Sequence, residues 1–393
     1  MVLEQVLAER PAAQPAARAD GPAPGRAESG PGPREPARDR YLFHPVVDFL
    51  CLGGGSLFVL ALLPLFLSTA SARPAVTAFV IMLAHVLNDP HFAHSYQIFY
   101  RNFRAKAFGP DYPTRLRLRY ILAGLAVPAA LFGFFATCVA MGDARLLAVG
   151  GNVMGFFVGW HYVKQGYGML IVDSVLKRQF FADGEKKLLL VNAYACWALS
   201  WLLVNLVYAE REVQGFSSIM LRPPMALVFA AITVAAVTTV LVLYMLVRRR
   251  LAGSGKLPVN GAVAYFASLY VWLCPLVNPL FLLLVPALHS LQYLTVVWRY
   301  QWNAASDRAG GAGASAGRRF AGFVAAGLLL GYLGFWGMPQ VLDALVPYDH
   351  RAFNGTMFMF MFWIFINLHH YFLDNVMWRR ENPDTRKYLF PHG

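Results

Sequence analysis

Long runs of apolar residues follow one another along most of this chain, and they restrict the folds that it can adopt. About 20 consecutive apolar residues are enough for a helix to cross a lipid bilayer. Ten runs of approximately that length occur, and only 14% of all residues are charged, against about 25% in a typical soluble domain. The sequence therefore predicts an all-α fold, a polytopic integral membrane bundle of about ten transmembrane helices. The expected spans are Val46–Ser68, Ala75–Phe99, Tyr120–Met141, Leu146–Val172, Leu188–Tyr208, Met225–Val247, Val259–Cys274, Leu276–Trp298, Phe320–Gly337 and Met357–Met377.

The seventh expected span is shorter than the others. Val259–Cys274 has 16 residues, and Pro275 and Pro279 follow it closely. This segment could cross the membrane or re-enter on the same side.

The basic residues are distributed unevenly among the loops. Of the 34 Lys and Arg residues, 22 follow the even-numbered spans, six lie in the first 40 residues and five lie in the other loops. Cytoplasmic loops of membrane proteins carry such an excess, so both termini are expected to be cytoplasmic. The net charge of +13 is accounted for by this topology, and no nucleic-acid partner is predicted.

The chain divides into three parts. Residues 1–40 are rich in Pro, Ala, Gly and Arg and contain no apolar run, which predicts a disordered cytoplasmic tail. Residues 41–378 form the transmembrane helical bundle, and residues 379–393 form a short basic cytoplasmic tail.

Six histidines in four even-numbered spans lie at a similar depth. Each one is past the midpoint of a span that runs towards the cytoplasm; His161, for example, is the sixteenth of 27 residues. Independent structural histidines have no reason to agree in depth, whereas a shared metal site requires it, and imidazole is a good ligand for iron, copper and zinc. The candidate metal ligands are His91, His94, His161, His289, His369 and His370.

The segment Ala84–Gln97 contributes two of these histidines. On a helix that turns about 100° per residue, His91 and His94 lie roughly 60° apart and share a face, while His85 points elsewhere. Pro90 is expected to kink the helix just before His91.

Other polar residues lie close to these histidines in sequence. Asp89 is four residues after His85 and Asp374 four after His370, so each carboxylate could orient an imidazole. Lys164, close to His161, could pair with a carboxylate or reach the interface. The residues expected around the ligands are Asp89, Asp374, Tyr162, Gln292 and Lys164.

At these residues the chain loosely resembles membrane-bound histidine-motif oxygenases, namely the desaturase and hydroxylase class and the bacterial Brp/Blh-type carotene-cleaving dioxygenases. Asp89-Pro90-His91-x-x-His94 is similar to a proline–histidine element of the latter, and Leu368-His369-His370 to a late histidine pair. Phe92 stands where a glycine is expected, and the H-x-x-x-H boxes of desaturases are absent from the sequence. The resemblance implies non-haem iron held by histidines of several transmembrane helices.

We therefore hypothesise a metal-dependent oxidoreductase or oxygenase of the bacterial inner (plasma) membrane. Its cofactor would be non-haem iron, its substrate a membrane lipid or isoprenoid-type molecule, and an electron-donor protein could supply reducing equivalents. One alternative is a haem-binding electron-transfer protein with two axial histidines. A further alternative is a transporter or a structural membrane subunit that uses the same histidines.

Overall fold

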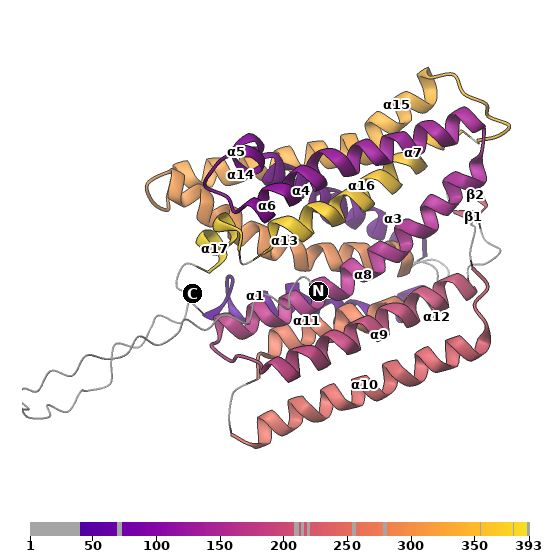
Figure 1. Ribbon diagram of the computed structural model, residues 1–393. Coiled ribbons are helices and arrows are strands. Elements are labelled where there is room, and N and C mark those ends of the chain that lie inside the picture. Colours follow the sequence, from indigo (N-terminus) through magenta and orange to yellow (C-terminus); the bar gives the residue numbers. More distant parts are fainter. Residues whose placement is uncertain are drawn as a thin grey trace, which may run out of the picture.

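The computed structural model describes residues 40–68, 73–207, 212–213, 216–217, 221–253, 257–277, 281–353, 355–379 and 381–390. Within them the chain is helical except for its connections and one antiparallel pair of two-residue strands, β1 (Glu212–Val213) and β2 (Phe216–Ser217). Figure 1 shows the long helices lying side by side along a common direction. The predicted all-α class is confirmed, whereas the predicted tail 1–40 lies outside the described residues except for Arg40.

The helical elements follow in chain order, with π-helical or 3₁₀ segments labelled η. The first half contains α1 Pro45–Phe49, η3 Leu50–Gly54, α2 Gly55–Ser68, α3 Arg73–Leu83, η4 Ala84–Asn88, α4 Asp89–Tyr100, α5 Phe103–Phe108, α6 Thr114–Ile121, η5 Leu122–Ala126, α7 Val127–Met141, α8 Ala144–Leu176 and α9 Asp183–Val207. The second half contains α10 Met225–Leu251, α11 Val259–Tyr270, η6 Val271–Leu273, α12 Cys274–Val277, α13 Phe281–Arg308, α14 Ala314–Tyr332, η7 Leu333–Gly337, α15 Met338–Leu345, α16 Met357–Met377 and α17 Pro383–Leu389.

Seven helices of the described chain are long and apolar enough to cross a membrane. They match the first six expected spans and the ninth, and they are Pro45–Leu62, Pro74–Tyr100, Thr114–Met141, Ala144–Leu176, Asp183–Leu206, Met225–Leu251 and Ala314–Leu345. The segment of the seventh expected span is divided into α11, η6 and α12. The eighth and tenth expected spans correspond to α13 and α16. Ten crossings therefore stay a prediction.

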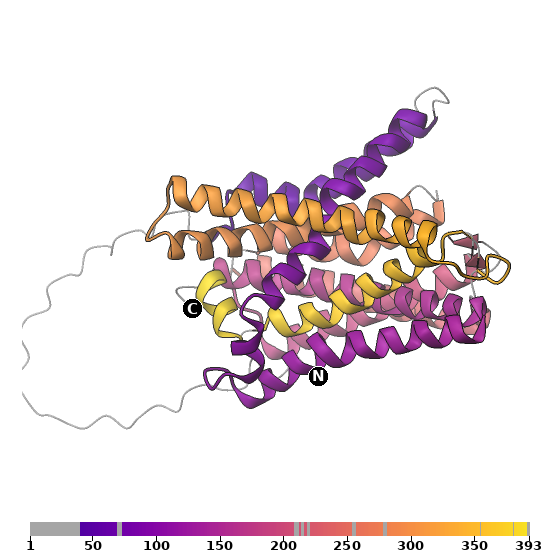
Figure 2. The same cartoon turned by 90° about the horizontal axis from the view of Figure 1, so that it is seen from above.

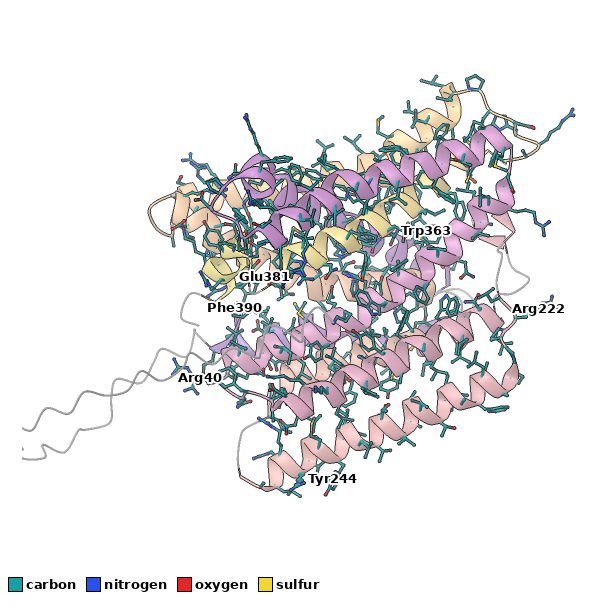
Figure 3. All side chains as sticks on the ribbon, viewed as in Figure 1. Arg40, Arg222, Tyr244, Trp363, Glu381 and Phe390 are labelled. Atoms are coloured by element: carbon teal, nitrogen blue, oxygen red, sulfur yellow. The ribbon has the colours of Figure 1, made fainter. Side chains whose placement is uncertain are left out.

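The connections after the even-numbered spans gather at one end of the bundle. In Figure 1, α5, α17, the α8–α9 connection and the α13–α14 turn lie on the left, while β1, β2 and the far end of α15 lie on the right. Figure 3 labels Arg40 and Glu381 at the left end and Arg222 at the right end. The loops that carry the excess of basic residues thus share one end, which we call the basic end.

Three helix breaks have the same physical cause. The π-helical segments η4, η5 and η7 each precede an α-helix whose second residue is a proline, namely Pro90, Pro128 and Pro339. A proline has no N–H to donate, and its ring collides with the carbonyl one turn earlier, so a widened turn relieves both problems. The kink predicted at Pro90 takes this form, and it sets the direction of α4 directly before His91.

Close contacts at glycine join two of the histidine-bearing helices, α4 and α8, to the neighbouring helices α14 and α11. A Cβ atom at Gly331 of α14 would lie 2.7 Å from the carbonyl carbon of Asp89 in α4, and a Cβ atom at Gly166 of α8 would lie 2.5 Å from the Cβ of Ser268 in α11. Small residues let membrane helices approach to this distance, where dispersion contacts stabilise the bundle.

The outer surface of the bundle is apolar and its interior contains the polar residues. Large apolar side chains are exposed along α7, α10 and α14, for example Phe132, Phe229 and Leu329. Figure 3 labels Tyr244 on the outer helix α10, and its side chain is also exposed. Figure 2 shows the early helices α2 and α3 projecting away from the bundle. An apolar surface of this extent is what lipid-facing helices require.

The segment predicted as a short basic tail, residues 379–393, is partly helical and packed. Asn382 caps α17 by accepting a hydrogen bond from the Asp384 N–H, and its side-chain amide donates to the Tyr120 hydroxyl at 2.9 Å. Thr385 and Leu389 of α17 are buried. The amide of Asn303 in α13 donates to the Tyr388 carbonyl at 2.8 Å. Most of this segment is therefore part of the folded body at the basic end.

Candidate metal centre

Four imidazole rings from four helices surround one point in the bundle interior. They belong to His91 of α4, His289 of α13, His161 of α8 and His370 of α16. Taken in that order around the point, neighbouring ring centres are 5.5, 5.2, 4.9 and 4.4 Å apart. Neighbouring rings cross at 87°, 76°, 77° and 73°. We call this arrangement the four-histidine centre.

The ring nitrogens of this centre lack the partners that buried polar atoms normally have. In the described structure, the Nε2 atoms of His91, His161, His289 and His370 are all buried, and none accepts or donates a hydrogen bond. More than nine in ten buried polar groups are satisfied in folded proteins, and each exception needs an explanation. The possible ligand atoms form two candidate metal-binding groups that share His161: His91, His161 and His289, and His161, His370 and Asp374.

The spacing of the rings fits a metal ion. The nitrogen atoms of His91, His161 and His289 that could bind metal lie within 4.8 Å of one another. A metal–nitrogen bond of about 2.1 Å puts the ring centre roughly 3.2 Å from the ion, so neighbouring rings in square or tetrahedral sites are about 4.6 to 5.3 Å apart. The observed range of 4.4 to 5.5 Å brackets these values.

Asp374 adds a carboxylate to the centre. Its Oδ2 atom lies 3.4 Å from Nε2 of His370 and 3.8 Å from Nε2 of His161. The other oxygen, Oδ1, accepts a hydrogen bond of 2.8 Å from the Tyr293 hydroxyl. The sequence predicted that Asp374 orients His370 from behind, but in the structure Oδ2 faces the unpaired nitrogens. Asp374 is therefore positioned as a further ligand.

Ser95 contacts the His370 ring at Nδ1, the nitrogen on the side away from Asp374. Its hydroxyl lies 2.7 Å from Nδ1 of His370 and 2.9 Å from the Tyr293 hydroxyl. A partner at Nδ1 fixes the orientation of the imidazole and leaves Nε2 for a metal. This is the support that a metal-binding histidine usually has.

Tyr162 supports His289 by stacking. The two rings are nearly parallel, at 7°, with their centres 3.5 Å apart. Next to them is a small cavity that the two rings line together with Ser56, Ala267, Ser268, Val271, Leu288 and Gln292. Tyr162 therefore packs directly against His289, and a small cavity adjoins the pair.

His94 does not join the four-histidine centre. Its Nδ1 lies 2.7 Å from Oε1 of Gln97, and its ring stacks on Phe323 of α14 at 4.2 Å. His91 and His94 were predicted to share a helix face, but the two side chains are far enough apart around the helix to have different neighbours. Helix α14 packs against α4 on the His94 side, so the His94 ring does not reach the other histidines. The predicted ligand set is corrected here.

His369 is also outside the centre, although it precedes His370. Its Nδ1 lies 3.0 Å from the Tyr96 hydroxyl, and its Nε2 lies 2.9 Å from the Ala123 carbonyl. Neighbouring residues of a helix are about 100° apart, so only one of this pair can face a given point. His369 makes the interhelical hydrogen bonds expected of a structural histidine.

Asp89 forms a separate group with two aromatic partners. Its Oδ2 lies 3.1 Å from Nδ1 of His85 and accepts a hydrogen bond of 3.1 Å from the Trp336 indole. The i+4 pairing of Asp89 with His85 that the sequence suggested is present, and the group joins η4 to η7. No hydrogen bond or ion pair of the described residues joins Asp89 to the four histidines.

Gln292 and Lys164 lie near the centre and make their contacts with other residues. Gln292 accepts a hydrogen bond of 3.0 Å from the Ser268 hydroxyl and donates to the Leu52 carbonyl, which ties α13 to α11 and η3. The ammonium group of Lys164 lies 5.7 Å from each of three aromatic ring centres, which belong to Trp160, Tyr167 and Tyr194. Both residues are therefore structural, at helix contacts near the centre.

Two residues of this centre were not among the predicted site residues. Ser95 lies four residues after His91, on the same helix face, and this spacing is the signal that could have identified it. Tyr293 lies four residues after His289, so the same spacing could have identified it.

Comparison with known proteins gives no match: no family model, no curated protein and no solved structure is similar to this chain.

Proposed function

We propose that the protein is a membrane-embedded, metal-dependent oxidoreductase that uses non-haem iron and acts on a lipid-soluble substrate. The observation that carries the proposal is a cluster of four buried histidines from four helices whose Nε2 atoms have no hydrogen-bond partner, and whose possible ligand atoms form, with Asp374, two groups of three that share His161. Nitrogen and carboxylate ligands suit iron, and an iron ion with a free coordination position supplies oxygen activation.

The residues of the chain divide the work between binding and support. His91, His161, His289 and His370 would hold the ion, with Asp374 as the anionic ligand that offsets part of its charge. Ser95 keeps Nε2 of His370 directed inward, and Tyr293 orients Asp374. The surrounding helices exclude water, which protects reactive species formed during oxygen chemistry.

The position of the centre supports a lipid-soluble substrate. Histidines 91, 161, 289 and 370 lie inside a bundle with an apolar exterior, so a substrate that reaches them from the membrane would have to be lipid-soluble. The resemblance to histidine-motif oxygenases points to the same chemistry.

The geometry favours an ion over haem. Haem needs a flat slot, as wide as the macrocycle, between its axial ligands. Here the four rings are mutually edge to face, and Tyr162 and Tyr293 fill the space beside His289 and His91. A transporter that moves protons through these four histidines is less well supported. In the described helices, the four rings form one closed group and do not make a path across the bundle.

The distribution of basic residues among the loops supports the proposed orientation in the membrane. We place ten crossings in a bacterial inner membrane, with the basic end in the cytoplasm. The four-histidine centre then lies in the half of the bundle nearer the cytoplasm.

Metal analysis of the detergent-purified protein, together with its absorption spectrum, tests the proposed function. The expected result is iron bound to the protein, with no Soret band. A Soret band, or protein free of metal after growth in iron-rich medium, would contradict the proposal.

A further inference from the structure

We propose that Tyr293 and Trp378 form a two-step relay that carries single electrons from a carrier protein at the basic end to the four-histidine centre. The inference rests on the proposed function, since it requires a redox-active ion at that centre. Its basis is an unbroken line of contacts from the imidazoles to a partly exposed tryptophan.

The inner contact joins the centre to Tyr293. The phenol ring crosses the His91 ring at 84°, with the centres 4.6 Å apart, and lies 5.5 Å from the His370 ring. The side chain of Tyr293 is buried, at 3% exposure, so no soluble molecule can reach it directly. Phenols are among the most easily oxidised side chains, and van der Waals contact with a ligand makes electron transfer fast.

The outer contact joins Tyr293 to Trp378. The Trp378 indole N–H donates a hydrogen bond of 3.3 Å to the Tyr293 hydroxyl, and the two ring centres are 5.8 Å apart. Trp378 caps the end of α16 and is partly exposed. The next residue, Arg379, pairs with Glu381, which Figure 3 labels at the basic end. Two aromatic rings therefore span the distance from the imidazoles to the molecular surface.

The hydrogen bonds provide a place for the proton. If the bound ion is in a state strong enough to oxidise a phenol, Tyr293 would give it an electron, the hydroxyl proton would move along the 2.8 Å hydrogen bond to Asp374, and a neutral tyrosyl radical would remain. Trp378 then reduces this radical, the proton returns from Asp374 to Tyr293, and the indole is left as a radical cation that keeps its N–H. A one-electron carrier protein restores Trp378. The net change is one electron from the carrier to the ion, with no net proton transfer.

The relay has a consequence for the class of reaction. Inserting one oxygen atom into a C–H bond, or removing two hydrogens, consumes two external electrons and two protons for each O₂ that is reduced. Dioxygenation of a double bond needs none. A built route for electrons therefore favours a hydroxylase or desaturase that depends on a carrier protein over a dioxygenase.

The partner implied is a small protein that carries one electron at a time and has an acidic docking face. Arg386 and Lys387, eight and nine residues after Trp378, are exposed; Lys387 pairs with Asp307, and Arg119 of α6 pairs with Glu381 at the same end. Opposite charge steers such partners together and orients them on contact.

The relay is tested in metal-free protein, which separates it from the proposed function. The full chain in detergent is stripped with a chelator and illuminated with ruthenium tris-bipyridine as photo-oxidant and persulfate as final electron acceptor. Freeze-quenched electron paramagnetic resonance then detects radicals. Wild type should show a tyrosyl component that is lost in Tyr293→Phe. Trp378→Phe should lose the same component, because the ruthenium complex cannot reach buried Tyr293 directly.

Matched variants decide the interpretation. Trp378→Tyr should regain the Tyr293 component, since it restores an oxidisable ring. Trp302→Phe, a partly exposed tryptophan of α13 that packs on Phe320, should retain it. Trp378→Leu replaces Trp378→Phe if the latter does not fold by circular dichroism. Persistence of the Tyr293 component in Trp378→Phe or Trp378→Leu, or its absence from wild type, would overturn the relay.

Metal content and radical lifetime complete the test. The iron-loaded protein is treated with hydrogen peroxide. Trp378→Phe should keep its iron, and its Tyr293 radical should persist longer than that of wild type, because the indole that returns an electron to Tyr293 is absent. Absence of iron from wild type itself would refute the proposed function and leave the metal-free result standing. Equal lifetimes of the Tyr293 radical in the two iron-loaded proteins would refute the relay alone.

Discussion

His91 and His370 meet edge to face, with ring centres 4.4 Å apart, although one belongs to α4 and the other to α16. No local structure connects them, so their contact depends on the packing of the whole bundle. The same is true of His161 and His289, which complete the four-histidine centre from α8 and α13. A site of this kind is built by the fold and is lost when the helices separate.

Asp374→Asn should weaken metal binding without unfolding the protein. The substitution keeps the size of the side chain but removes the charge that faces Nε2 of His161 and His370. Loss of a supporting carboxylate typically lowers metal affinity by about 10- to 100-fold. Chelator competition on the purified variant measures the change. An affinity equal to that of wild type would show that Asp374 plays no part in the centre.

The packing of α14 against α4 can be tested at two glycines of the same helix. A Cβ atom at Gly331 would lie 2.8 Å from the Asp89 carbonyl oxygen, whereas none of the described atoms lies within 4 Å of the Cβ position at Gly322. Gly331→Ala should therefore destabilise the protein by about 1 to 3 kcal/mol. Gly322→Ala, the control, should be neutral or stabilising by up to about 1 kcal/mol, because alanine favours a helix. Thermal unfolding in detergent compares them; equal effects would contradict the close approach.

Much of the helical architecture was predictable from the sequence, because runs of apolar residues determine where helices can form in lipid. The agreement in depth of His91, His161, His289 and His370 also predicted that they could meet. Depth alone did not distinguish them from His94 and His369. The distinction depends on how each helix is rotated about its axis, and that rotation is set by tertiary contacts.

The rotation of α4 about its axis is an example of what the sequence alone could not predict. The π-helical segment η4 shifts the register of the helix before His91, and Gly327 of α14 leaves space for the His94 ring, which a Cβ there would meet at 2.2 Å. An ideal helix drawn from the sequence contains neither effect. The sequence placed Asp89 near the metal ligands because it lies four residues after His85. In the structure its carboxylate contacts His85 and the Trp336 indole.

Lys106 should give the protein a distinctive pH dependence. Burial lowers the pKa of this lysine from 10.5 to about 8, while Asp384, 3.8 Å away, acts in the opposite direction. Between these two pH values the unfolded chain binds more protons than the folded one, so stability should rise with pH by up to about 3 kcal/mol. The other charges that act on Lys106 are those of Arg101 and Arg308.

Thermal unfolding from pH 7 to pH 10.5 measures this effect against Lys106→Met. The rise should be present in wild type above pH 8 and smaller in the variant. Above pH 10, where Lys106 is neutral in the folded protein, the variant should also be the less stable of the two, because the Lys106 amine donates a 2.8 Å hydrogen bond to the Ile98 carbonyl near the end of α4. Parallel pH profiles for the two proteins would contradict the assignment.

The orientation in the membrane is tested by reporter fusions. Fusions at Arg104 and Arg249, which belong to the basic end, should report the cytoplasm. Fusions at Ala144 and Asp349, at the opposite end, should report the other side. A fusion at Arg249 that reports the outside would reverse the proposed orientation and would place the centre in the outer half of the membrane.

The most direct test of the account is the metal content of His370→Ala compared with that of its neighbour His369→Ala. Both side chains are buried on α16, but only His370 faces the four-histidine centre. His370→Ala should lose the metal, as should His91→Ala, His161→Ala and His289→Ala. Combining two of these changes should add little, because the first already breaks the centre. His369→Ala should keep the metal. Full metal occupancy in His370→Ala and the other three variants would contradict the existence of the centre.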